Sequence, residues 1–165
     1  MELTIKQLLT LVCNWLDSTA LSQFIQREAW VVPSVQTVHL LAIAALMGSM
    51  LVVNLRVIGF YERNQPLINI TSRFIPVIWA ALPILLITGS ILIIGEPARS
   101  LKNNIFQLKI LLILVAIGLT YAFNKPLKDN PEHWEDREGL GRIFGVISCL
   151  VWIAIIFAGR WIAYV

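Results

Sequence analysis

Charged residues are scarce in this 165-residue sequence: only 14% are Asp, Glu, Lys or Arg, whereas hydrophobic residues make up 58%. An ordinary soluble domain has about 25% charged residues, so this composition excludes that class. The net charge is only +3 at pH 7, and the basic residues form no cluster, which argues against a nucleic-acid partner. The scarcity of charge therefore indicates a membrane protein.

Chemical signatures are also few. The two cysteines, Cys13 and Cys149, match neither a CxxC nor a zinc-site spacing and form no disulfide framework. The sequence contains no nucleophile elbow, phosphate-binding loop or HExxH motif. Glu96 is the only acid adjoining the outer ends of the apolar stretches described next, so the acidic relay usual in proton-coupled transport is missing.

Four apolar stretches are long enough to cross a bilayer, which takes about 20 residues each. They are residues 29–55, 74–95, 105–123 and 143–165. The second contains Pro76 and Pro83, which neighbouring helices can accommodate within a membrane. These stretches predict an all-α fold, an integral membrane four-helix bundle spanning 29–165. The polar segment 124–142 is expected to be a solvated loop.

Residues 1–28 have a different pattern. Between residues 3 and 16, apolar side chains recur at helical spacing and polar ones lie off that face, which predicts an amphipathic helix in the membrane interface. A signal peptide is the alternative, but the segment lacks a basic start and has only a short apolar run. We expect it to remain in the mature chain.

Three ionisable side chains lie within the apolar stretches, where each is a candidate functional group because burying it in hydrocarbon is costly. His39 lies about 12 Å along the first span, Lys109 roughly 6–8 Å into the third, and Arg160 at a similar depth in the fourth. All three fall in the same half of the membrane. Helix packing is expected to bring them to one pocket.

An apolar disc carrying two carboxylates, haem, would satisfy these groups. A neutral His39 would ligate the iron, and Lys109 and Arg160 would pair with the propionates. Met47 lies below His39 on the same helix face and would form part of the wall. Other interpretations remain open: a hydrogen bond from His39 to a neighbouring helix, extension of the Lys109 and Arg160 side chains to the headgroups, and simple packing of Met47.

The remaining histidine, His133, belongs to the polar segment 124–142. It lies roughly 22 Å from His39, since about 15 helical residues separate His39 from the inner end of its span. One haem cannot bind both side chains. His133 is therefore expected to be a solvated loop residue.

Short motifs around these residues resemble known membrane families. The segments Val38-His39-Leu40-Leu41 and Phe106-Gln107-Leu108-Lys109 resemble the HemJ-type protoporphyrinogen oxidases, and the four-helix layout is similar to that of CopD-like membrane domains. The ending Gly159-Arg160-Trp161 resembles a group of uncharacterised small bacterial membrane proteins. The HemJ-type resemblance implies a bound haem b with His39 and Lys109 as functional residues. The further intramembrane histidines of that family are absent, which argues against a diheme relay.

Together these features predict a haem-b membrane redox protein in the bacterial inner membrane. It would exchange electrons with a quinone-like or tetrapyrrole (porphyrin) substrate, as a membrane oxidoreductase. The alternative is a non-catalytic membrane subunit or transport component that resembles CopD-like permease domains. The expected partner is the lipid bilayer, and a homodimer or a larger membrane complex is left open.

The distribution of Lys and Arg predicts the orientation in the membrane. One side carries seven basic residues in its connections and the other carries four, when Lys109 and Arg160 are left out. The richer side should be cytoplasmic, which places both termini outside. A reporter fused after Lys128 should therefore remain inside the cell, and exposure of that reporter at the outer surface would contradict the predicted topology.

Overall fold

The computed structural model describes residues 2–61, 64, 66–129, 134 and 137–162. Within these residues the chain is all helical, without a strand, as the sequence predicted. The helices are α1 (Glu2–Asp17), α2 (Ala20–Arg27), α3 (Val31–Ile58), α4 (Leu67–Gly95), α5 (Pro97–Leu101), α6 (Asn104–Asp129) and α7 (Glu138–Trp161).

Helices α3, α4, α6 and α7 are long and apolar enough to cross a membrane. Their outward faces carry large hydrophobic side chains such as Leu41, Leu86, Leu114 and Leu150, each more than half exposed. Apolar surface of this extent would be unfavourable in water but is matched by lipid. The chain is a multi-pass membrane protein whose long helices contact lipid.

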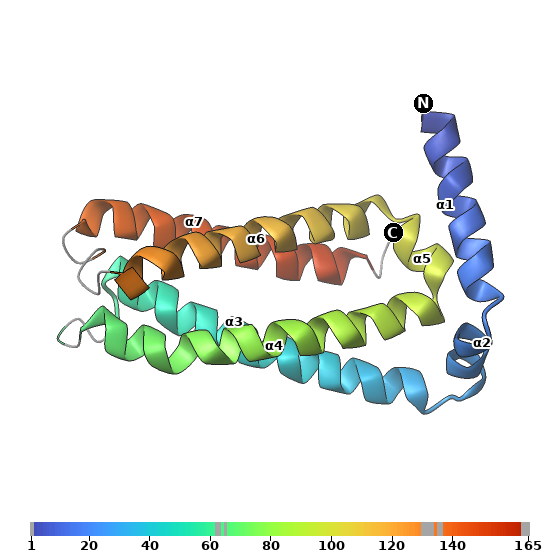
Figure 1. Cartoon of the computed structure of the whole chain (residues 1–165), viewed down its shortest axis with the longest axis horizontal. Helices are drawn as coiled ribbons and strands as arrows, with labels where there is room; N and C mark the ends of the chain where they lie inside the picture. The colour runs from blue at the N-terminus through green and yellow to red at the C-terminus, as the bar shows by residue number, and fades with distance from the viewer. Residues whose placement is uncertain (1, 62–63, 65, 130–133, 135–136, 163–165) are drawn as a thin grey trace.

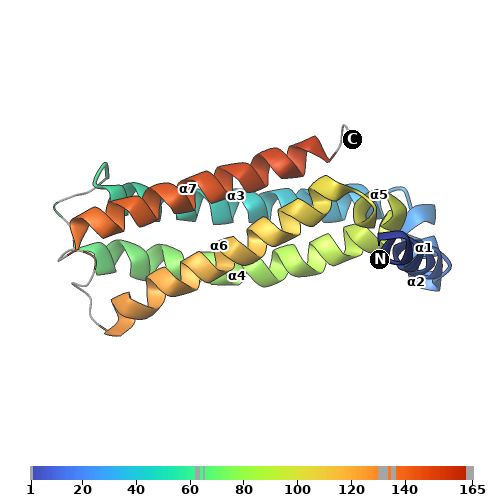
Figure 2. The same cartoon turned by 90° about the horizontal axis from the view of Figure 1, so that it is seen from above.

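The four long helices pack as two pairs. Close backbone contacts join α3 to α4, α6 to α7, and the two pairs to each other through α3 and α7. Within the described residues, no comparable contact joins α4 to α6. Figure 1 shows the α3–α4 pair and the α6–α7 pair separating toward the end that carries α5. Figure 2 shows α6 crossing over α4 rather than running beside it.

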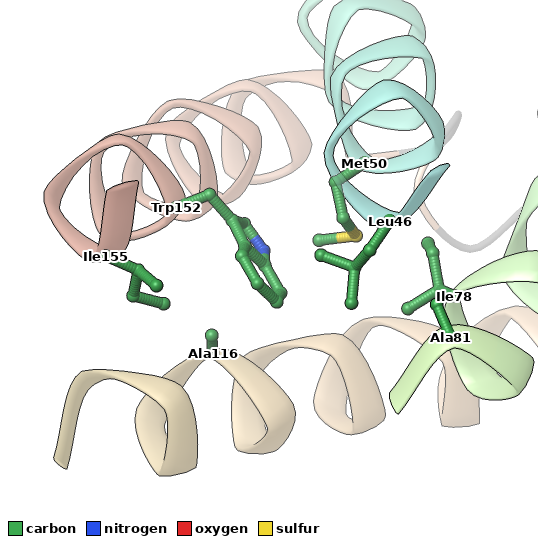
Figure 3. Close-up of a cluster of buried hydrophobic side chains, with 7 residues drawn as sticks. All are labelled: Leu46, Met50, Ile78, Ala81, Ala116, Trp152 and Ile155. Atoms are coloured by element: carbon green, nitrogen blue, oxygen red, sulfur yellow. The ribbon is translucent and has the colours of Figure 1, made fainter. Parts of the chain in front are cut away.

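A hydrophobic cluster at the centre holds the two pairs together (Figure 3). It comprises Leu46 and Met50 of α3, Ile78 and Ala81 of α4, Ala116 of α6, and Trp152 and Ile155 of α7. The Trp152 ring extends from α7 toward Ala116, whose small side chain is completely buried. Among the described residues, the Trp152 indole N–H is the one buried side-chain polar group without a hydrogen-bond partner.

A second cluster closes the end opposite α5. It consists of Val53, Leu67, Ile75, Phe123 and Leu127, packed against the aromatic rings of Trp134 and Phe144. The Phe123 and Trp134 rings stack with centroids 5.3 Å apart, and the Trp134 indole donates to the Phe123 carbonyl oxygen at 3.1 Å. Packing in this cluster explains why the start of α4 and the end of α6 differ from the predicted boundaries.

Helix α4 begins at Leu67 rather than at residue 74, and α6 continues to Asp129, past Pro126. The prediction of a solvated loop over 124–142 was therefore wrong at both of its ends, since α7 also begins early, at Glu138. Leu67 and Leu127 are almost fully buried in the second cluster, so tertiary packing stabilises helix beyond the apolar stretches.

Six hydroxyl groups in the long helices share one bonding pattern. Each of the six donates its proton to the carbonyl oxygen four residues earlier, at 2.6–3.0 Å. The donors are Thr37, Ser49, Thr71, Thr88, Ser90 and Thr120. Such back-bonding satisfies a hydroxyl proton without help from another helix. The oxygen lone pairs remain available to accept a hydrogen bond.

The N-terminal segment is two helices. The expected amphipathic helix is present as α1, and α2 follows after a turn in which the Thr19 hydroxyl accepts a hydrogen bond from the Ser22 N–H at 3.3 Å. Helix α1 runs across the α5 end of the bundle rather than along it (Figure 1), as expected of an interfacial helix.

Three contacts fasten this segment to the bundle. The Cys13 thiol donates to the Pro97 carbonyl oxygen at 3.6 Å, and the Ser22 hydroxyl donates to the Ile94 carbonyl oxygen at 2.7 Å. Ile25 packs directly on Gly95, where an added Cβ would lie 2.9 Å from an Ile25 methyl group. Residue 95 must therefore be very small for α2 to dock.

We expect Gly95→Ala to weaken the docking of α2, because the new methyl group overlaps buried Ile25. Overpacking of this kind costs about 1–3 kcal/mol. Limited proteolysis in detergent micelles should cut the variant faster between α2 and α3. Gly48→Ala is the matched control, since a Cβ there meets nothing within 4 Å. Equal cleavage rates for both variants and the parent would contradict the proposed contact.

Candidate functional site

His39 lies in α3 at the end of the bundle where the helix pairs separate, and its ring is half-buried. Its Nδ1 is 2.7 Å from the Thr88 hydroxyl oxygen of α4. The Nε2 atom makes no hydrogen bond with the described part of the chain. One ring nitrogen, Nδ1, is thus fixed by a hydrogen bond, and the other, Nε2, has no partner among the described residues.

Gly89 lies beside the same ring. A Cβ at this position would be 3.5 Å from His39 Cε1, which is ordinary van der Waals contact. The imidazole therefore lies beside the α4 backbone at this position, with room for a methyl group. Thr88 holds the ring by a hydrogen bond, and Gly89 lies next to it.

Lys109 of α6 is also half-buried. Its side chain lies over Gly159 of α7, where an added Cβ would be 3.5 Å from Nζ. Within the described ranges, Lys109 has no carboxylate partner. The candidate site thus has two parts: His39 with Thr88 and Gly89 between α3 and α4, and Lys109 with Gly159 between α6 and α7.

Of the residues predicted from sequence, His39 contacts Thr88 of α4, and Lys109 lies against Gly159 of α7. Arg160 follows Gly159, and its side chain is exposed at the same end of the bundle. Met47 instead packs against the central hydrophobic cluster, about 12 Å further along α3 than His39. The packing interpretation therefore accounts for its position. His133 lies outside the described residues.

A second polar group lies nearer the opposite end. The Asn54 side-chain amide of α3 donates to the Ser148 hydroxyl of α7 at 3.2 Å, and both residues are buried. The Asn54 amide and the Ser148 hydroxyl therefore form a buried hydrogen bond between α3 and α7. They offer no open position comparable to that at His39.

Comparison with known proteins identifies one family. A model for a family of unknown function, DUF6644, matches residues 14–165. The chain belongs to this family. No curated protein and no solved structure matches it. The matched region begins within α1 and includes all four long helices, so every residue of the candidate site lies inside it.

Sequence reasoning did not assign a role to Thr88 or Gly159. A threonine followed by glycine in an apolar run is ordinary, and its pairing with a histidine 49 residues away requires the packing of α3 on α4. Depth was a usable signal. Thr88 lies seven residues before the C-terminal end of α4 and His39 eight residues after the start of α3, which places them at similar levels in two antiparallel helices.

Proposed function

We propose that the chain is a haem-b membrane redox protein in which His39 is the axial iron ligand. It would exchange electrons with a quinone-like or tetrapyrrole substrate. The main support is the state of the His39 ring: Nδ1 is engaged by Thr88, and Nε2 has no partner among the described residues. Metal-binding histidines typically have one ring nitrogen held by a hydrogen bond and the other directed to the metal.

The donor set fits haem better than a metal ion held by side chains alone. In the part of the chain that the structure describes, no three His, Cys, Asp or Glu side chains gather. Haem needs only one or two axial ligands from the protein, because the porphyrin supplies the others. A bound haem would supply one-electron chemistry at its iron.

The residues of the site would bind and orient this group. His39 would ligate through Nε2, with Gly89 of α4 beside the ring. Lys109 would pair with a propionate, because an ammonium group without a carboxylate partner in a membrane span is otherwise poorly stabilised. Arg160 is proposed as the second anchor. The surrounding lipid-facing helices would exclude water from the iron.

Substitution of the proposed ligand is the primary test. His39→Ala should abolish the Soret band of the protein purified from haem-replete cells, while the variant still inserts and elutes as the parent does. His133→Ala should leave the band unchanged, because that residue lies far from the site in sequence and predicted depth. A His39→Ala protein with an unaltered spectrum would overturn the haem assignment. A colourless parent protein would favour the non-catalytic subunit or transport component.

Lys109→Ala should weaken haem retention without removing the iron ligand. A charge-assisted hydrogen bond is worth about 1.5–3 kcal/mol, or roughly a 10- to 100-fold change in affinity. Haem titration of the apoprotein, followed at the Soret maximum, measures this change. Lys102→Ala, which removes an exposed lysine near the same end, should bind haem as the parent does. Equal affinities for all three proteins would exclude Lys109 as an anchor.

A further inference from the structure

The hydrogen bonds of Thr88 determine which nitrogen of His39 carries the proton. A threonine hydroxyl has one proton to donate and lone pairs that can accept. The Thr88 hydroxyl donates to the Ile84 carbonyl oxygen at 2.6 Å, so its proton is already used within α4. Toward His39, 2.7 Å away, the same oxygen can therefore act only as an acceptor.

A neutral imidazole must then donate from Nδ1, because two lone pairs facing each other at this distance would repel. The proton on Nδ1 leaves Nε2 as an unprotonated lone pair. In the opposite tautomer the Thr88 hydroxyl would have to turn its proton from the Ile84 carbonyl oxygen to Nδ1. That would leave the Thr88 and Ile84 oxygens 2.6 Å apart with no proton between them, which is repulsive.

We propose that Thr88 is a positioning residue that holds His39 in the Nδ1–H tautomer and so keeps Nε2 ready to bind a metal centre. Thr88 does not touch the ligand itself. It acts through the imidazole, and its back-bond to Ile84 makes the assignment one-directional. The tautomer assignment stands on this geometry alone. Its value for haem binding rests on the proposed function.

The test uses the apoprotein labelled with ¹⁵N-histidine in lipid nanodiscs, in a His133→Gln background so that one histidine signal remains. The parent should show a protonated Nδ1 and an unprotonated Nε2. Thr88→Val, which keeps the shape but removes the hydroxyl, should shift the ring toward the Nε2–H tautomer. Thr88→Ser should restore the parent spectrum. Thr120→Val is the matched control, because that buried hydroxyl is back-bonded in the same way but has no histidine partner.

Haem titration of the same variants separates this proposal from the proposed function. Loss of an outer-shell partner typically weakens metal binding 10- to 100-fold, so Thr88→Val should bind haem about that much more weakly, with rescue by Thr88→Ser. An Nε2–H parent, or a Thr88→Val spectrum identical to it, would overturn the positioning role. If the tautomer shifts as expected but no variant binds haem, the positioning role stands and the haem proposal fails.

Discussion

The hydrogen bond between His39 and Thr88 is the interaction on which the candidate site depends. It joins α3 to α4, orients the imidazole, and leaves the other ring nitrogen, Nε2, without a hydrogen-bond partner among the described residues. In a lipid-embedded bundle a polar group needs a partner from the protein, so this bond also makes a histidine tolerable at that depth. Packing of the two helix pairs then decides what the open nitrogen faces.

Polar side chains have different hydrogen-bond partners at the two ends of the bundle. Near the second hydrophobic cluster, Asn54 and Ser148 bond to each other, and stacked aromatic rings close the end. Near α5 the helix pairs separate, and His39 and Lys109 keep unused capacity for binding. The central cluster around Trp152 lies between these regions and fixes their relative position. Packing and hydrogen bonds stabilise the end near the second cluster, whereas the His39 Nε2 atom near α5 remains available to bind a ligand.

Apolar runs predicted the four long helices because bilayer thickness demands them, and the sequence also singled out His39 and Lys109 as ionisable residues within those helices. Helix ends at Leu67 and Asp129 could not be predicted, since polar residues there look like loop until packing of Leu67 and Leu127 is known. Helix α5 is too short to produce a periodic pattern. The role of Thr88 depends on the bond of its proton to the Ile84 carbonyl and on its contact with His39 in another helix, and only the folded structure shows these two contacts.

The back-bonded hydroxyls make the interior of the spans poor in proton donors. Each of these Thr and Ser protons is committed to its own helix, so the side chains display oxygen lone pairs rather than O–H groups. Among the buried side-chain atoms of the described residues, the Trp152 indole N–H is still without an acceptor, and Lys109 has no carboxylate partner in the same part of the chain. A guest that accepts hydrogen bonds would therefore be oriented by these indole and ammonium donors rather than by the hydroxyl groups.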